Sequence, residues 1–342
     1  MCYKISLEPI THFLTGAVLS RAGFNRKTAL ATATMTLGAE ALDLDVLWQF
    51  KGPVSSFAHH RGFTHSFLGL LLVSAVVTGV VYLIWRLRGR KTNIPSLPPR
   101  WGLLFLFAYI AGLSHILLDF TNNYGVRPFW PFWEKWYSWD IVFIFEPALY
   151  IILIAGLVVP EILSRRNPIA RGRYAAIAGL ACVAGLYAMR DHEHRDAVEA
   201  LNSMHFNLEA PVRVSAYPYY WHLFRWHAVA ETNDSFVTST LDSWTGKLNL
   251  KEVQFFRKPP ETPATLAAKR SYLGRVYLDW AQYPIVTQTV SGGNVIVHFR
   301  DLRFDYPEFR GRITLSCTVE LDRDLHVVAE RFGSREQSPP LD

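Results

Sequence analysis

The chain has 342 residues, enough for two domains, and half of them are hydrophobic, including 11 Trp, 15 Tyr and 22 Phe. The net charge of +6 does not indicate a nucleic-acid-binding protein, because the basic residues cluster in short loops between apolar segments. Three scattered cysteines predict neither a disulfide framework nor a CxxC metal site. The aromatic excess is instead typical of a protein with side chains at membrane–water borders.

Six apolar segments occupy the first part of the chain. Residues 11–20 and 28–42 are small-residue-rich and predict short or tilted helices. Residues 66–86, 101–120 and 141–160 are each about 20 residues long, enough to cross a hydrocarbon core of ~30 Å as a helix. Residues 174–189 form a shorter sixth segment. We therefore expect an α-helical membrane domain of about six membrane-embedded helices over residues 1–190.

The remaining chain, residues 191–342, has the pattern of a mainly β soluble domain. Short alternating segments at 236–240, 272–279, 295–299, 313–321 and 325–332 predict strands. The Ser-Gly-Gly-Asn sequence at 291–294 predicts a hairpin loop. No nucleophile-elbow or phosphate-loop motif occurs in the sequence.

The basic clusters predict the membrane topology. Clusters at 21–27, 86–100 and 165–173 alternate with the apolar segments, and positive charge favours the cytoplasmic side. With all three clusters inside, the β domain is extracytoplasmic and the polar residues near the helix ends gather at the outer border. We expect a multi-pass protein of the cell inner membrane, with membrane lipid as its surroundings and no nucleic-acid partner.

Those polar residues form a candidate metal site. His115 and Asp119 are four residues apart, on one face of a predicted helix. Imidazole and carboxylate together suit zinc, manganese or iron, and the number of ligands allows one or two ions. The alternative is that these groups cap helices or satisfy buried polar atoms, but ionisable groups beside apolar helices are costly and are usually functional. The full set is His12, Asp43, Asp45, His60, His65, His115 and Asp119.

Two further carboxylates, Asp140 and Glu146, precede or enter the apolar segment at 141–160. We expect Asp140 to orient a ligand histidine. We place Glu146 about two turns deep in that helix, where it serves either proton transfer or a buried hydrogen bond. The aromatic stretch at 127–140 predicts an interfacial belt.

Three motifs occur in a characteristic order: LDLD at 42–45, HRGFTHS at 60–66 and SHILLD at 114–119. Together with His12 they resemble a bacterial inner-membrane-associated metal-dependent hydrolase family, one label of which is "LexA-binding". The resemblance covers about residues 10–150, and HRGFTHS is its most specific part. Leu42 stands where the family usually has proline. The resemblance implies metal chemistry without specifying a substrate.

The resemblance also implies individual roles. His60, His65, His115 and Asp119 are the leading metal ligands, followed by Asp43 and Asp45, and His12 completes the set or relays protons. Arg61 would hold a phosphate or carboxylate in two-point contact, or form a salt bridge to Asp43 or Asp45. Gly62 would allow the turn before the next helix, and Thr64 would cap that helix. His59 lies outside the motif.

The function expected from these patterns is a membrane-bound metal-dependent hydrolase at the outer membrane–water border. Asp43 or Asp45 would accept the proton, and the substrate would be a lipid or a lipid-linked phosphoester. The alternatives are a metal or proton transporter, and a membrane scaffold with a structural metal whose β domain binds a partner. Apolar long segments favour hydrolysis over transport, because a transport path requires polar residues through the bilayer.

Overall fold

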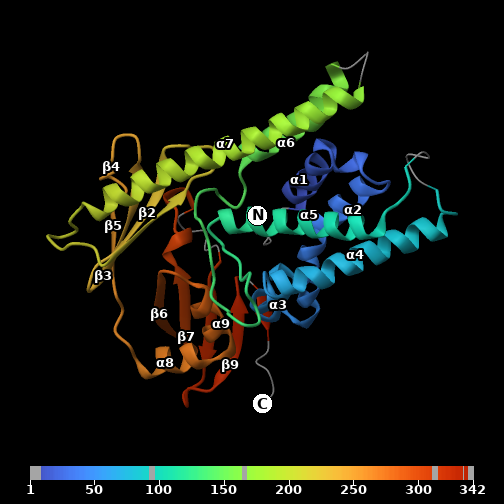
Figure 1. The fold of residues 1–342 in the computed structure, drawn as a ribbon. Helices are drawn as coiled ribbons and strands as arrows, with labels where there is room; N and C mark the ends of the chain where they lie inside the picture. The colour runs from blue at the N-terminus through green and yellow to red at the C-terminus, as the bar shows by residue number, and fades with distance from the viewer. Residues whose placement is uncertain (1–8, 92–96, 164–167, 310–314, 334, 338–342) are drawn as a thin grey trace. The chain divides into compact units, whose positions relative to one another are not determined.

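The computed structural model describes residues 9–91, 97–163, 168–309, 315–333 and 335–337. The chain forms two compact units (Figure 1). The helical unit contains residues up to Asp45 and Arg61–His192, and the β unit contains Val46–His60 and the chain from Glu193 onward. The expected boundary near residue 190 lies close to Glu193, but the β unit also takes in a segment from within the membrane half of the sequence.

Three helices in the described part of the chain are long and apolar enough to cross a membrane: α4 (Phe67–Leu87), α5 (Trp101–Thr121) and the Gly172–Asn202 part of α7 (Pro168–Asn202). The other helices of this unit are α1 (Pro9–Ala22), α2 (Ala31–Glu40) and α6 (Pro147–Leu163). With 14, 10 and 17 residues, these helices are shorter than the about 20 residues of a typical crossing. Length and composition thus support three membrane-crossing helices among the described residues, and the expected six are not confirmed.

Close contacts between small residues hold the short helices against the long ones. Gly38 of α2 faces the backbone of Ala108 in α5, where an added Cβ would lie 2.9 Å from the Ala108 carbonyl oxygen. Gly156 of α6 similarly faces Gly179 of α7. Without side chains at these points the backbones approach closely, which is how helices commonly associate in lipid.

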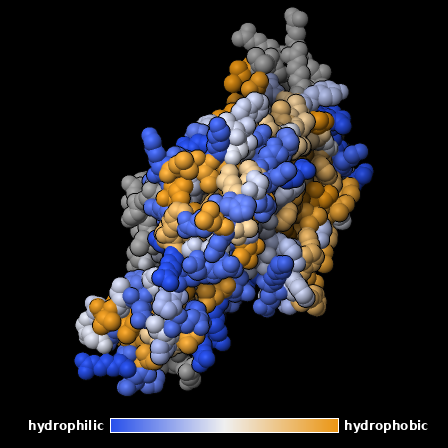
Figure 2. Space-filling model, turned by 90° about the vertical axis from the view of Figure 1, so that its left-hand side faces the viewer, coloured by the Kyte–Doolittle hydropathy of each residue, from blue (hydrophilic) through white to orange (hydrophobic). Residues whose placement is uncertain are grey.

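Apolar side chains on the outer faces of the helices fit a lipid environment. In α4, Leu68, Leu72, Val76 and Val80 are exposed at four-residue spacing, so they form one stripe along the helix. Surface apolar residues are also visible in the space-filling view (Figure 2). Ser66 caps α4 by accepting a hydrogen bond from the Gly69 amide at 2.9 Å, so the expected cap, Thr64, is wrong by two residues.

Two predicted apolar segments are divided differently in the structure. The segment at 28–42 forms α2 and then passes into a 3-10 helix, η2 (Ala41–Lys51). The segment at 141–160 becomes helical only at Pro147, because proline suits the first turn of a helix. Glu146 therefore precedes α6 and is not two turns deep. Its carboxylate accepts a 2.7 Å hydrogen bond from the Arg190 guanidinium of α7, and both side chains are buried.

The β unit has two antiparallel five-stranded sheets. The first sheet has the order β1-β2-β3-β4, with β5 also pairing with β3. The second has the order β10-β9-β8-β7-β6, and its hairpin between β6 and β7 lies at the predicted 291–294 turn. The strands are β1 (Arg213–Pro218), β2 (Arg225–Glu231), β3 (Ser235–Asp242), β4 (Lys247–Leu248), β5 (Gln254–Arg257), β6 (Pro284–Ser291), β7 (Asn294–Asp301), β8 (Cys317–Leu321), β9 (Val327–Phe332) and β10 (Arg335–Gln337).

Helices complete the β unit. The predicted strand at 272–279 is wrong: these residues form α9 (Tyr272–Trp280), which Ser271 caps by accepting from the Gly274 amide at 3.1 Å. Phe57 of α3 (Pro53–His59) stacks on Phe332 of β9, so segment 46–60 adds to this core. The β unit also contains α8 (Pro263–Arg270) and the 3-10 turns η4 (Leu302–Phe304) and η5 (Pro307–Phe309), whereas the 3-10 turns η1 (Phe24–Arg26) and η3 (Phe63–His65) belong to the helical unit.

The buried pair of Glu146 and Arg190 leads to a stability prediction. Arg190→Met should lower the free energy of unfolding by about 3–5 kcal/mol, because it leaves a buried carboxylate without its cation. Adding Glu146→Leu should restore most of that loss. Denaturation of detergent-solubilised protein, followed by tryptophan fluorescence, measures both. Arg86→Met, at an exposed position of α4, is the matched control, and equal losses in the two single variants would contradict a buried pair.

Candidate metal centre

Four segments of the helical unit bring ionisable side chains together. α1 supplies His12, η2 supplies Asp43, η3 supplies His65, and α5 supplies His115 and Asp119. All five side chains are buried. His115 and Asp119 face the same way because one helical turn separates them.

Four donor atoms converge at the centre of this cluster. The Nε2 atoms of His65 and His115 are 3.0 Å apart. Asp119 Oδ2 lies 3.3 Å from His65 Nε2 and 3.2 Å from His115 Nε2. Asp43 Oδ1 lies 3.6 Å and 3.5 Å from the same two nitrogens.

These separations match the spacing of ligands around a small divalent ion. Ligand atoms about 2.0–2.1 Å from a tetrahedrally coordinated ion lie about 3.3 Å from one another. The five separations run from 3.0 to 3.6 Å. Asp43, His65 and His115 thus form one group of donor atoms close enough to share an ion, and His12, His115 and Asp119 form a second group that shares His115. Imidazole and carboxylate are donor types that zinc, manganese and iron accept.

The outer nitrogens of both imidazoles have partners that fix the ring orientation. His115 Nδ1 lies 2.5 Å from the carbonyl oxygen of Ala39, so Nδ1 carries the proton and the Nε2 lone pair faces the cluster. His65 Nδ1 lies 3.5 Å from Asp45 Oδ2 and 3.0 Å from Thr64 Oγ1. Carboxylate and carbonyl partners of this kind orient metal-binding histidines. The geometry thus gives Asp45 an orienting position beside His65, whereas Asp43 reaches the centre.

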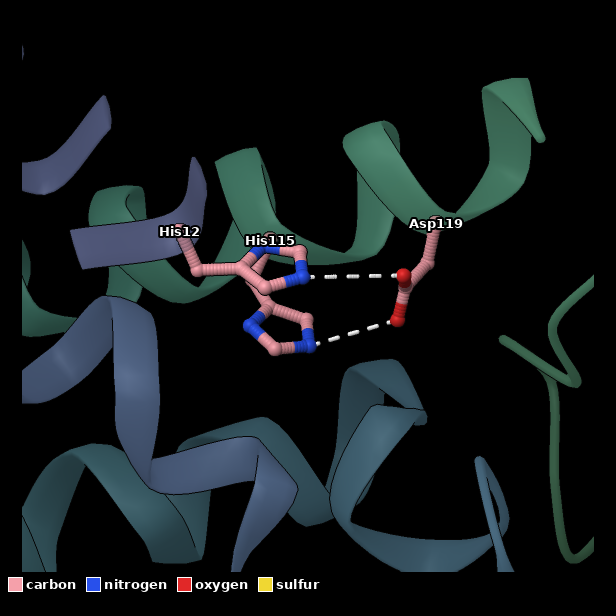
Figure 3. A group of neighbouring side chains, drawn as sticks. All are labelled: His12, His115 and Asp119. Atoms are coloured by element: carbon pink, nitrogen blue, oxygen red, sulfur yellow. Dashed lines mark ion pairs between the residues drawn. The ribbon is translucent and has the colours of Figure 1, made fainter. Parts of the chain in front are cut away.

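His12 lies beside the four donors. Its ring stacks on His115 with centroids 3.5 Å apart, and its Nε2 is 3.7 Å from Asp119 Oδ1 (Figure 3). His12 Nδ1 is buried and has no hydrogen-bond partner among the described residues. A buried imidazole with an unused nitrogen can carry a proton to or from the centre.

Arg61 is held by several partners at once. Its guanidinium donates to Asp119 Oδ1 at 2.6 Å and to Asn122 Oδ1 at 3.1 Å. The same group donates to the Gly125 carbonyl at 3.1 Å. Its backbone amide donates to Asp45 Oδ2 at 2.8 Å. The guanidinium therefore pairs with Asp119, not with the two expected carboxylates.

The backbone turn in this motif falls on an unexpected residue. Arg61 has φ 52°, in the left-handed region, whereas Gly62 has φ −91°. Non-glycine residues rarely occupy that region, and they do so when surrounding contacts hold them. The bonds from Arg61 to Asp119, Asn122 and Gly125 supply those contacts, so the arginine shapes the turn that leads to His65.

The cluster carries an excess of negative charge. Asp43, Asp45 and Asp119 against Arg61 leave a formal charge of minus two when the histidines are neutral. Burial alone would raise the pKa of the Asp43 carboxyl, but the imidazoles of His115 and His65 hold that pKa well below its usual range. Burial alone would lower the pKa of His65, yet hydrogen bonding to Asp119 and Asp43 raises it. The site thus favours a bound cation, either a proton or a metal ion.

Some expected residues lie outside the cluster. His60, at the end of α3, is buried but belongs to neither group of closely spaced metal-binding side chains found in this region. His59 stacks on Trp48 at 3.7 Å and its Nδ1 lies 2.9 Å from the Ser55 carbonyl. Asn122 was not expected from the sequence. Its position directly after an apolar helix, three residues beyond Asp119, is the signal that would have identified it.

Comparisons with known proteins place these motifs in a family. Residues 7–193 match the family described as YdjM inner membrane protein. An uncharacterized protein of Bacillus subtilis (strain 168), YfhP, is 27% identical over 133 residues, which are 38% of this chain and 36% of the relative. The match thus spans about a third of that relative's length. No solved structure matches the chain. The family match covers more than half of the chain and every residue of the cluster, and the chain therefore belongs to the YdjM inner membrane protein family.

Proposed function

We propose that this inner-membrane protein is a metal-dependent hydrolase. The observation that supports this proposal best is the gathering of His65, His115, Asp43 and Asp119 in a buried site, where each carboxylate has an oxygen 3.2–3.6 Å from both imidazole Nε2 atoms. A bound zinc, manganese or iron ion would polarise a scissile phosphoryl or acyl group and lower the pKa of a bound water.

The other residues of the cluster orient the metal-binding side chains or transfer protons. Asp45 and the Ala39 carbonyl orient the two imidazoles, and Arg61 orients Asp119. Asp43 Oδ2 is buried and lacks a hydrogen-bond partner in the described part of the chain, and we assign it as the oxygen that accepts the proton. His12 would then carry that proton away. Arg61 is already occupied by Asp119, Asn122 and Gly125, which argues against a two-point grip on substrate.

The substrate we propose is a lipid or a lipid-linked phosphoester. His65 precedes the first residue of α4 by two positions, and Asp119 precedes the last residue of α5 by two positions. Both helices are long and apolar enough to span a membrane. The metal centre would therefore lie at a membrane border, at the depth of lipid headgroups. The basic clusters favour the extracytoplasmic border.

A second function, a scaffold with a structural metal, is favoured by the number of buried protein donors in the cluster. Four protein ligands around zinc are typical of structural sites, whereas catalytic zinc keeps a position for water. Manganese or iron accepts more ligands and would leave that position open. Transport is less well supported, because Glu146 lies at the start of α6 and pairs with Arg190.

Ligand substitutions test the metal centre. His65→Ala and His115→Ala should each reduce metal affinity by about tenfold or more, since each removes a donor atom. Metal analysis of detergent-purified protein measures the loss, with circular dichroism as the check on folding. His59→Ala is the matched control, because His59 contacts Trp48 and Ser55 outside the cluster. Full metal retention in both ligand variants would exclude this site.

Hydrolysis assays separate the two functions. Purified protein loaded in turn with zinc, manganese or iron should cleave a member of a panel of aryl phosphate monoesters, diesters and carboxylic esters. His12→Gln should keep the metal but lower turnover by about 100-fold, as expected for loss of a proton-transfer group. Metal-loaded protein that cleaves no ester in the panel, even when phosphatidic acid and other lipid phosphoesters are added, would favour the scaffold.

Cysteine labelling tests the proposed side of the membrane. In a background in which Cys2, Cys182 and Cys317 are replaced by serine, Ser203→Cys should react with an impermeant thiol reagent in intact cells. Gly89→Cys should not react, because it follows α4 at the opposite end from His65. An added Cβ at Gly89 meets no atom within 4 Å, so the position has room for the label. The reverse labelling pattern would place the metal centre on the cytoplasmic side.

A further inference from the structure

A cavity of about 430 Å³ lies among α1, η1, α2 and α6. Arg21, Asn25 and Arg26 supply hydrogen-bond donors on its lining, Ala17 and Leu157 supply apolar surface, and Thr32 and Glu161 also line it. The two arginines outnumber the one carboxylate. Arg173 of α7 adds a further cation beside the cavity, where its Nε donates to the Ala22 carbonyl at 3.1 Å.

Arg21 is fixed in its place at this cavity. Its guanidinium pairs with Glu161 of α6 and donates to the Leu157 carbonyl at 3.3 Å. The group also lies against Gly172 of α7, where an added Cβ would come within 2.4 Å of it. A guanidinium held by three neighbours presents its charge at a fixed point, which reduces the entropy lost on binding an anion.

The cavity lies at the opposite end of α5 from the metal centre. Thr28, which links η1 to α2, accepts a 2.7 Å hydrogen bond from the Arg100 amide immediately before α5. Phe24 of η1 packs edge-on against Phe107 near the start of α5. His115 and Asp119 are in the last two turns of the same helix. If α5 spans the membrane, as its length and composition allow, the cavity lies at the other membrane border.

An apolar stripe lies on α6, next to the residues of this helix that line the cavity. Ile154, Val158 and Ile162 are exposed and spaced four residues apart, so they lie on one face of the helix. Leu157 and Glu161, which line the cavity, are the adjacent positions. A cavity lined by two arginines next to an exposed apolar stripe matches a molecule with an anionic head and hydrocarbon chains.

We infer that this cavity binds the phosphate headgroup of an anionic phospholipid, with the acyl chains along the α6 stripe. Basic pockets between membrane helices bind such headgroups through charge and hydrogen bonds. The arginines recognise the phosphate group. The apolar stripe on α6 next to the cavity favours a membrane lipid over free phosphate. The inference does not depend on hydrolysis at the metal centre.

Lipid-dependent thermal stability tests this site in the full-length protein. Titration with phosphatidylglycerol in mixed micelles should raise the Tm, whereas phosphatidylcholine should raise it much less. Arg26→Gln should weaken the apparent affinity for phosphatidylglycerol by about fivefold, as expected for one cation near a lipid headgroup. Arg88→Gln removes the same charge from an exposed position after α4, outside the cavity lining, and should leave the affinity unchanged.

A third variant should strengthen the binding of phosphatidylglycerol. Glu161→Gln removes the carboxylate that competes for Arg21 and should tighten phosphatidylglycerol binding. If the Arg26 and Arg88 substitutions weaken the affinity for phosphatidylglycerol equally, general surface charge explains the binding. That result would reject the proposed site. Glycerol 3-phosphate alone should give no protection. Protection equal to that of the lipid would reject the acyl-chain stripe and leave a site for soluble phosphate.

Discussion

Buried negative charge is the constraint on which the helical unit depends. Three carboxylates surround two imidazoles, and one guanidinium offsets only part of their charge. Burying an unpaired carboxylate costs several kcal/mol. Asp119 illustrates the problem, because it faces His65, His115 and Arg61 with almost no exposure to solvent. A cation at the centre removes the imbalance, so the packing of α1, η2, η3 and α5 and the binding of an ion stabilise one another.

Much of this arrangement follows from local sequence pattern. The apolar segments at 66–86 and 101–120 agree with α4 and α5 to within one residue, because length and hydropathy alone define a membrane helix. The convergence of His65, His115 and Asp119 was also predictable. Helical spacing places the last two on one face, and the HRGFTHS motif supplies the first. The strands at 236–240 and 295–299 were found because β-branched and aromatic residues alternate there.

Other features depend on contacts that a sequence does not display. Residues 272–279 fit a two-residue period as well as a helical one, and the helix forms because Ser271 caps it and Leu273, Tyr277 and Trp280 bury one face. The short lengths of α1 and α2 agree with the short or tilted helices expected there, but their packing against α5 was not visible, because buried helices and membrane helices have similar composition. The pairing of Arg61 with Asp119 joins residues 58 positions apart, beyond the reach of any local pattern.

The direction of two helices links the proposed sites at the two membrane borders. α2 and α5 run the same way, since Thr28 contacts Arg100 at one end and the Ala39 carbonyl contacts His115 at the other. Their carboxyl ends therefore both approach the metal centre, and their amino ends approach the basic cavity. A helix carries partial negative charge at its carboxyl end and partial positive charge at its amino end, worth roughly 0.3–1 kcal/mol per nearby ion. The two helices thus favour a cation where the carboxylates gather and an anion where the arginines gather. At each border the helix ends and the charged side chains therefore favour an ion of the same sign. This ion is a cation at the metal centre and an anion at the basic cavity.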